Sequence, residues 1–173
     1  MDRPAHDWQK CFQELAPRLI LYARQLTASQ ADAEDVVQLA FVRWWQHNPG
    51  ADRAHVPLLY AAVRTISMDA RRSEERRLRR EATVESDEAY FEPFVQHRET
   101  AELLARALQE LPPEQREVVT LRIWGDLSFA EIATATQASI NTVAGRYRYA
   151  LKALQKVLEP MRADLLEAEP LPA

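Results

Sequence analysis

The sequence contains little glycine and almost no cysteine. Its 173 residues include three glycines and one cysteine, Cys11. So few glycines disfavour a β protein with many tight turns and favour helices. A single cysteine excludes an intramolecular disulfide and a zinc site built from several cysteines.

Other absences narrow the function. No apolar run approaches the roughly 20 residues that span a bilayer, and the N-terminus lacks the apolar region of a signal peptide. We therefore expect a cytoplasmic protein. The four histidines are scattered, the glycines are isolated, and no nucleophile is spaced with a base and an orienting group. We expect no metal, no cofactor and no enzymatic activity.

The charge is unevenly distributed, although the net charge is only −4. Residues 64–80 carry a net charge of +4, and so do residues 140–156. The acidic stretch 83–102 lies between them with a net charge of −5, and 159–173 carries −3. Two separate basic segments are typical of a chain that contacts nucleic acid at two places.

Apolar periodicity predicts helices along most of the chain. The expected ranges are two helices within 7–27, then 30–47, 57–80, 97–110, 113–124, 128–136 and 140–158. Residues 82–96 are acidic, contain Pro93 and have weak periodicity, so we expect a linker. From Glu167 onward we expect fraying.

These elements predict an all-α fold with two small helical domains joined by a flexible acidic linker. The expected boundaries are 1–81, the linker 82–96, the second domain 97–160 and an acidic tail 161–173. Each domain is small for an independent core, so each should gain from docking on something larger.

Residues 128–158 have the pattern of a helix-turn-helix. Ser128 and Glu131 form a predicted capping box, and Ser139 is the predicted cap of the second helix. One face of that helix is apolar and includes Val143 and Leu151. The opposite face is basic and carries amides, as a recognition helix requires. The candidate DNA contacts are Asn141, Thr142, Ala144, Gly145, Arg146, Arg148, Tyr149 and Lys152.

The helix expected at 30–47 has a second, unusual face opposite its apolar core stripe. Leu39 and Val42 lie there, framed by acids and amides. This pattern favours a surface that docks on another protein. The face consists of Asp32, Asp35, Gln38, Leu39, Val42 and Gln46.

Two groups of motifs resemble one family. Asp-Ala-Glu-Asp-Val-Val-Gln (32–38) with Leu-Ala-Phe-Val-Arg-Trp-Trp (39–45) resembles region 2 of bacterial sigma-70 factors. Leu-Pro-Pro-Glu-Gln-Arg-Glu-Val-Val (111–119), with the helix-turn-helix that follows, resembles region 4. Their order, the acidic linker and the short length are similar to the extracytoplasmic-function subgroup.

The resemblance implies an alternative sigma factor that binds core RNA polymerase and directs promoter recognition, DNA melting and transcription initiation. The face 32–46 would dock on the β′ clamp helices, and region 4 on the β flap. Helix 57–80 would read and melt the minus-ten element, while 140–152 would read the minus-thirty-five element. An anti-sigma factor is a candidate further partner. The minus-ten candidates are Arg64, Thr65, Asp69, Arg71 and Arg72.

The sequence departs from the family pattern at several positions. Thr65 replaces a common Asn, Leu58 replaces a common Trp, and Ala144-Gly145 replaces a basic residue followed by Ser. The usual turn glycine is replaced near Gln137-Ala138. These departures affect the expected promoter sequence more than the fold.

Two alternatives come from other classes of protein. A stand-alone helix-turn-helix regulator, such as one with an output domain like that of a response regulator, shares the 111–158 pattern. It needs no docking face and should dimerise on paired half-sites. A helical protein that binds polymerase without initiating, or a small enzyme, is the other alternative.

Overall fold

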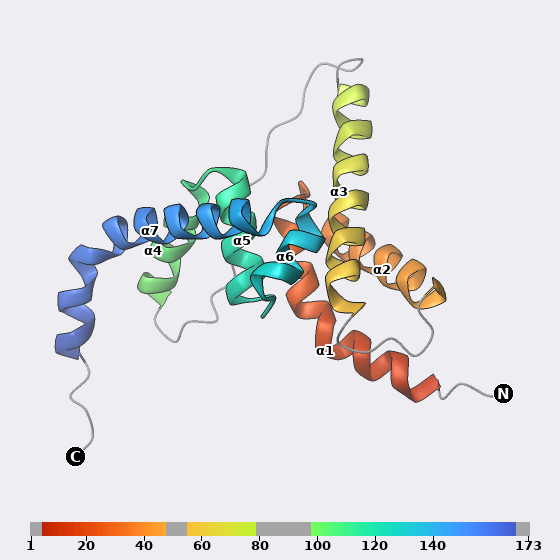
Figure 1. Cartoon of the computed structure of the whole chain (residues 1–173), viewed down its shortest axis with the longest axis horizontal. Coiled ribbons are helices and arrows are strands. Elements are labelled where there is room, and N and C mark those ends of the chain that lie inside the picture. The colour runs from red at the N-terminus through yellow and green to blue at the C-terminus, as the bar shows by residue number, and fades with distance from the viewer. Residues whose placement is uncertain (1–4, 48–54, 79–97, 169–173) are drawn as a thin grey trace.

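The computed structural model describes residues 5–47, 55–78 and 98–168, and side chains within 9–47, 55–72 and 103–159. Over these ranges every regular element is a helix (Figure 1). The helices are α1 (Ala5–Arg24), α2 (Gln30–His47), α3 (Val56–Leu78), α4 (Arg98–Gln109), α5 (Pro113–Ile123), α6 (Phe129–Thr136) and α7 (Ile140–Ala168). None of these described helices is long and apolar enough to cross a membrane.

The all-α prediction is confirmed, and five helices begin and end within two residues of their expected positions. The linker 82–96 and the loop that contains Asn48-Pro49-Gly50 lie outside the described residues. Trp44 bridges that loop, since its indole N–H donates to the backbone oxygen of His55 at 3.2 Å. This bond ties the end of α2 to the start of α3.

The prediction of two helices within 7–27 is wrong, because α1 is continuous and contains Pro17. Proline is well tolerated in the first turn of a helix, where its missing N–H costs nothing, so the sequence predicted that a second helix begins near Pro17. Apolar residues on both sides of Pro17 nevertheless belong to one core, including Phe12, Leu15, Leu19 and Tyr22. Tertiary packing therefore holds the helix together through the proline.

The expected end of the last helix is also wrong, because α7 continues to Ala168 instead of ending at 158. Leu151 differs from expectation too, since it is 40% exposed although it was assigned to the buried face. Val143, Ala150 and Leu154 fill that face instead. The buried face of α7 is thus narrower than the apolar face that the sequence predicted.

The two groups of helices pack directly on each other. In Figure 1, α1, α2 and α3 form one group, α4, α5 and α7 the other, and α6 lies between them. Helix α6 packs against α3, and α5 contacts α1. One apolar cluster contains Leu59 and Val63 of α3 together with Val118 of α5 and Ile132 of α6. The first half of the chain (α1 to α3) and the second half (α4 to α7) therefore bury apolar surface against each other, as the small size of each predicts.

Two buried tyrosines meet in this shared region. The rings of Tyr22 and Tyr60 make an edge contact with centroids 5.5 Å apart. Burial, with a smaller contribution from Asp126, raises the pKa of Tyr60 to about 12, although Arg18 acts in the opposite direction. The Tyr60 hydroxyl has no hydrogen-bond partner among the described residues.

Tyr60→Phe should reduce the loss of stability at alkaline pH. An unfolded tyrosine releases its proton near pH 10, whereas folded Tyr60 keeps it to about pH 12. The unfolded chain therefore binds fewer protons above pH 10, and the free energy of unfolding falls there by about 1.4 kcal/mol per pH unit for this residue. Urea unfolding followed by tryptophan fluorescence at pH 7 to 11 measures the slope. At pH 7 the variant should differ from wild type by less than about 1 kcal/mol.

Tyr149→Phe is the matched control, because the Tyr149 side chain is 59% exposed. It should keep the wild-type slope. Equal slopes in all three proteins would contradict the role given to Tyr60.

Candidate functional site

The predicted docking face of α2 is a continuous exposed surface. Ser29 caps the helix, since its hydroxyl oxygen accepts from the Asp32 backbone N–H at 3.1 Å and its O–H donates to the Asp32 carboxylate at 2.7 Å. The core side is buried from Ala33 to Trp44. On the other side, Leu39 is 41% exposed and Val42 is 53% exposed. The structure leaves all six predicted residues exposed: Asp32, Asp35, Gln38, Leu39, Val42 and Gln46.

The helix-turn-helix begins with the expected capping box. The Ser128 hydroxyl accepts from the Glu131 backbone N–H at 3.3 Å, and the Glu131 carboxylate accepts from the Ser128 backbone N–H at 2.7 Å. Helix α6 ends at Thr136, and the residue that caps it, Gln137, has a φ of 56° and a ψ of 36°. This left-handed conformation favours glycine. Gln137 therefore adopts a strained backbone conformation at the turn where the family usually has glycine.

Helix α7 presents a polar front away from the core. Ser139 caps it, because its hydroxyl oxygen accepts from the Thr142 backbone N–H at 3.1 Å. The hydroxyls of these two residues also hydrogen bond at 2.8 Å, so the Thr142 hydroxyl belongs to the cap. The guanidinium of Arg148 lies 5.3 Å from the centroid of the Tyr149 ring. The front is exposed at Asn141, Thr142, Arg148, Tyr149 and Lys152 and half-buried at Ala144, Gly145 and Arg146.

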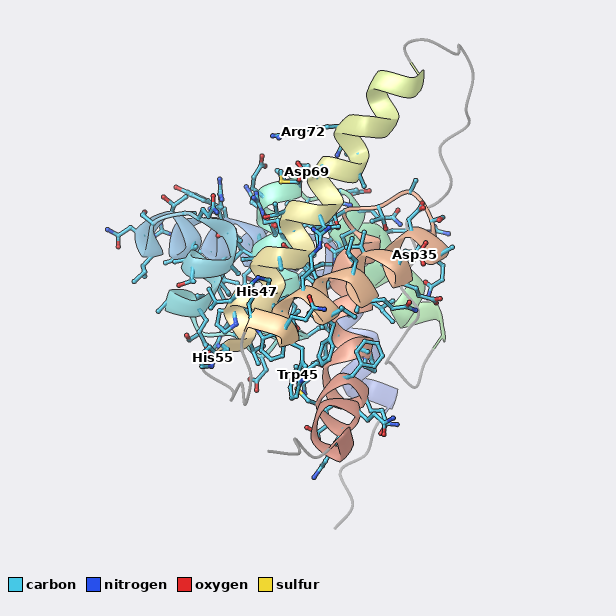
Figure 2. The ribbon with its side chains drawn as sticks, turned by 90° about the vertical axis from the view of Figure 1, so that its right-hand side faces the viewer. Asp35, Trp45, His47, His55, Asp69 and Arg72 are labelled. Atoms are coloured by element: carbon cyan, nitrogen blue, oxygen red, sulfur yellow. The ribbon has the colours of Figure 1, made fainter. Side chains whose placement is uncertain are left out.

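Four of the five candidates on α3 are exposed. Figure 2 shows Asp69 and Arg72 on this helix, apart from Asp35 on α2. The Arg72 guanidinium lies 3.9 Å from the Asp69 carboxylate. The Thr65 hydroxyl donates to the Ala61 backbone oxygen at 2.9 Å. Arg71 is exposed like these residues.

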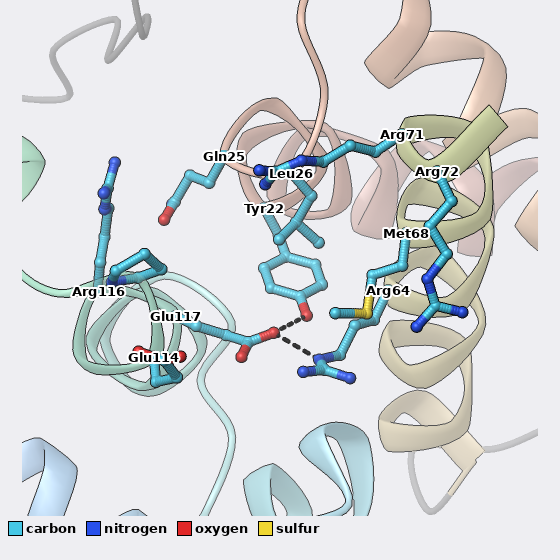
Figure 3. Close-up of a pocket in the computed structure, with 11 residues that line it drawn as sticks. Tyr22, Gln25, Leu26, Arg64, Met68, Arg71, Arg72, Glu114, Arg116 and Glu117 are labelled. Carbon is cyan, nitrogen blue, oxygen red and sulfur yellow. Dashed lines mark hydrogen bonds and ion pairs between the residues drawn. The ribbon is translucent and has the colours of Figure 1, made fainter. Parts of the chain in front are cut away.

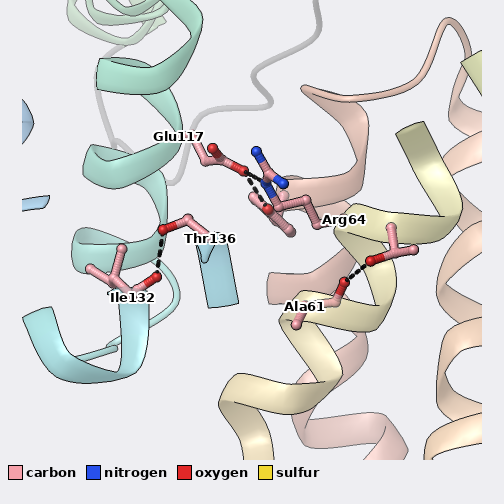
Figure 4. Close-up of polar contacts among 7 residues, drawn as sticks. Ala61, Arg64, Glu117, Ile132 and Thr136 are labelled. Atoms are coloured by element: carbon pink, nitrogen blue, oxygen red, sulfur yellow. Dashed lines mark hydrogen bonds and ion pairs between the residues drawn. The ribbon is translucent and has the colours of Figure 1, made fainter. Parts of the chain in front are cut away.

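Arg64 differs from the other candidates because it is held by the other half of the chain. Its Nε donates to Oε1 of Glu117 on α5 at 2.9 Å (Figure 4). The Arg64 side chain is 25% exposed, and the Glu117 side chain only 8%. A candidate DNA contact is thus engaged inside the chain.

Glu117 is the centre of a small network that the sequence did not predict. The same Oε1 atom also accepts from the Tyr22 hydroxyl at 2.7 Å (Figure 3). Burial first, and then the Glu117 carboxylate, raise the pKa of Tyr22 well above its ordinary value. One turn away, the Gln25 amide donates to the Thr120 hydroxyl at 2.7 Å.

The network escaped prediction because its partners are distant in sequence. Tyr22 and Arg64 lie 95 and 53 residues from Glu117. The structure supplies what the sequence lacked: residues 117–121 are all buried, so this turn of α5 is covered on every side and an acid there needs a partner. Periodicity alone could not say which residues supply it.

A hollow of about 500 Å³ opens beside this network (Figure 3). Its lining includes Met68 and Leu26 and is richer in arginine than in acid. The arginines are Arg64, Arg71, Arg72 and Arg116, and the acids are Glu114 and Glu117. Within the described side chains, no group of three or more histidines, cysteines or acids is arranged to hold a metal ion.

Comparison with protein families gives two matches along the chain. The model described as Sigma-70 region 2 matches residues 11–80, and the model described as Sigma-70, region 4 matches residues 101–154. The first match contains all of α2 and α3, and the second contains α5, α6 and the first half of α7.

Individual relatives agree with these matches. The chain is 33% identical over 155 residues to the ECF RNA polymerase sigma factor SigL of Mycobacterium tuberculosis, covering 87% of this chain and 88% of the relative. It is 32% identical over 149 residues to the RNA polymerase sigma-E factor of Streptomyces avermitilis, covering 84% and 82%.

Solved structures share the fold. The sigma factor RpoE of Bartonella quintana, solved in complex with the anti-sigma factor NepR, has a TM-score of 0.72 at 22% identity and covers 88% of this chain and 97% of its own. CnrH, solved in complex with the cytosolic domain of CnrY, has a TM-score of 0.57 at 23% identity and covers 88% of each chain. With both family regions matched in order, the chain belongs to the sigma-70 family, in its extracytoplasmic-function subgroup, and is an alternative sigma factor that directs promoter-specific transcription initiation by RNA polymerase.

Proposed function

We propose that the exposed face of α2 docks this sigma factor on the β′ clamp helices of core RNA polymerase. The observation that carries the proposal is the exposure of Leu39 and Val42 amid acids and amides, on a helix whose opposite side is fully buried. Apolar residues surrounded by a polar rim are the common anatomy of a protein interface. The chain then works in the cytoplasm, contributes no catalytic group, and leaves the chemistry of RNA synthesis to the polymerase.

The two halves have separate roles in DNA recognition under this proposal. The exposed part of α3, with Thr65, Asp69, Arg71 and Arg72, contacts and melts the minus-ten element. The front of α7 enters the major groove at the minus-thirty-five element, where Asn and Arg can read base edges and cations can pair with phosphates. The β flap holds the second half in place.

Simultaneous reading of both elements requires the two halves to separate. The element names place them about 25 base pairs apart, which is about 85 Å of duplex at about 3.4 Å per base pair. In the structure, α3 packs directly on α6, the helix that precedes α7. We infer that the described conformation is a closed state of the free chain and that polymerase binds an open one.

An anti-sigma factor is a further partner in this proposal. RpoE of Bartonella quintana and CnrH share the fold of this chain, and each was solved with an anti-sigma factor or with the cytosolic domain of a second protein. A closed chain with a hollow between its halves offers such a partner contacts to both at once.

Asp35→Arg and Leu39→Asp should each strongly weaken docking on core polymerase. Truncation or charge reversal at the centre of an interface costs about 2 kcal/mol or more, which weakens binding by about 30-fold. Co-elution of the purified chain with core polymerase measures the loss and needs no known promoter.

Two matched variants control for charge and solubility. Glu14→Arg makes the same charge change on exposed Glu14 of α1, and Val157→Asp makes a similar apolar-to-acid change on 36% exposed Val157 of α7. Both should co-elute as the wild type does. Equal behaviour of all four variants would contradict docking through α2.

Gly145→Ala should stabilise the free chain and weaken promoter recognition. A methyl group at Gly145 would meet no atom within 4 Å, and alanine favours a helix interior over glycine by about 1 kcal/mol. The same methyl would hinder close approach of α7 to the groove, so minus-thirty-five binding should fall about fivefold, or about 1 kcal/mol. Urea unfolding measures stability. Transcription from a promoter selected with the wild-type holoenzyme measures recognition.

Ala153→Gly is the reverse change at an exposed position of the same helix. It should lower stability by a similar amount and leave promoter recognition unchanged. If Gly145→Ala transcribes as well as wild type, the glycine has no role in the approach to DNA.

A further inference from the structure

Glu117 brings together two hydrogen-bond donors from the first half of the chain. Its Oε1 atom accepts from Tyr22 of α1 at 2.7 Å and from Arg64 of α3 at 2.9 Å (Figure 3). The acceptor belongs to α5, in the other half. Opening the chain therefore removes the acceptor and leaves both donors side by side.

The two donors have the chemistry of a site for a phosphate oxygen. A carboxylate oxygen and a phosphodiester oxygen are both anionic acceptors, and guanidinium groups bind either one with strong, charge-assisted hydrogen bonds. Arg71 and Arg72 line the same hollow, which adds positive charge around the pair. An anion is favoured there once Glu117 has left.

Tyr22 has a feature that simple packing does not require. Phenylalanine would fill the same apolar site, but the Tyr22 hydroxyl is buried and hydrogen bonds to Glu117. A phenol is protonated at neutral pH, and burial raises the pKa of Tyr22 further, so its hydroxyl acts as a donor. The Tyr22 hydroxyl can thus donate to an anionic oxygen that the first half of the chain does not itself supply.

We propose that Tyr22 and Arg64 form a binding site for a phosphodiester of the promoter strand, and that Glu117 fills this site in the closed chain. The inference rests on the proposed function, because it takes α3 as the minus-ten reader. It adds a DNA contact on α1, which the predicted site lacks. Because the Glu117 carboxylate and a DNA phosphate would use the same two donors, the closed chain cannot bind the promoter strand at this site.

Glu117→Gln tests the proposal in the free, full-length chain. Gln removes the negative charge at almost constant volume, so the closed contact weakens and the site becomes available. The probe is a fluorescein-labelled, mixed-sequence single-stranded DNA of 20 nucleotides, measured by fluorescence anisotropy. Affinity should rise about fivefold to tenfold over wild type. The slope of log affinity against log salt should steepen by about 0.7, which corresponds to one added phosphate contact on a single strand.

Glu114→Gln is the matched control, since Glu114 lines the same hollow, is exposed, and loses the same charge. It should raise affinity less than twofold. In the Glu117→Gln background, Arg64→Gln should return both affinity and salt slope to wild-type values. Tyr22→Phe in that background should lower affinity about threefold without changing the slope, because a neutral hydroxyl releases no counterion.

Two results would overturn the proposal: equal binding by Glu117→Gln and Glu114→Gln, or no effect of Tyr22→Phe in the Glu117→Gln background. Thermal melting checks that each variant folds. If Glu117→Gln does not fold, Tyr22→Phe and wild type are compared as holoenzymes, where the same threefold difference is expected and its absence overturns the proposal. The anisotropy assays use the free chain and do not depend on docking, so failure of the α2 experiment would be a separate result.

Discussion

The packing of α6 against α3 is the constraint on which the rest of the structure depends. Each half of the chain is too small to bury much apolar surface alone, and a single cluster joins Leu59 and Val63 to Ile132 and Val118. Helix α5, with residues 117–121 all buried, lies at the centre of this arrangement. The closed chain is therefore a consequence of size. A small sigma factor that must span two promoter elements has to exchange this internal interface for contacts with the polymerase and DNA.

The polar contacts at the boundary make that exchange specific. Apolar packing alone would hold the two halves together, but it would not let DNA in particular compete with that contact. The Glu117 carboxylate binds Arg64 and Tyr22 in the way that a backbone phosphate would, so the closed state uses the same donors that we assign to the open state. Glu117 and Arg64 thus bind each other in the closed chain before either meets a partner.

Local features of the structure could be predicted from the sequence, whereas contacts between its halves could not. The capping box at Ser128 and the cap at Ser139 both depend on neighbours three residues away, and both predictions are confirmed. The break expected near Pro17 failed because packing on both sides of the proline outweighed one lost hydrogen bond. The role of Glu117 depends on residues 53 and 95 positions away, which neither periodicity nor motif spacing relates to it. The exposure of the six residues of the α2 face could be predicted because it follows from helical geometry alone, whereas their role in docking stays a prediction.

The most direct test of this account is the distance between the two halves, free and on the polymerase. Dyes are attached at Glu14→Cys on α1 and Gln155→Cys on α7, both exposed positions, with Cys11→Ser to remove the native thiol. Energy transfer between the dyes should be efficient in the free chain and should fall sharply when core polymerase is added. Efficient transfer that persists in a transcriptionally active holoenzyme would contradict the opening on which this account depends.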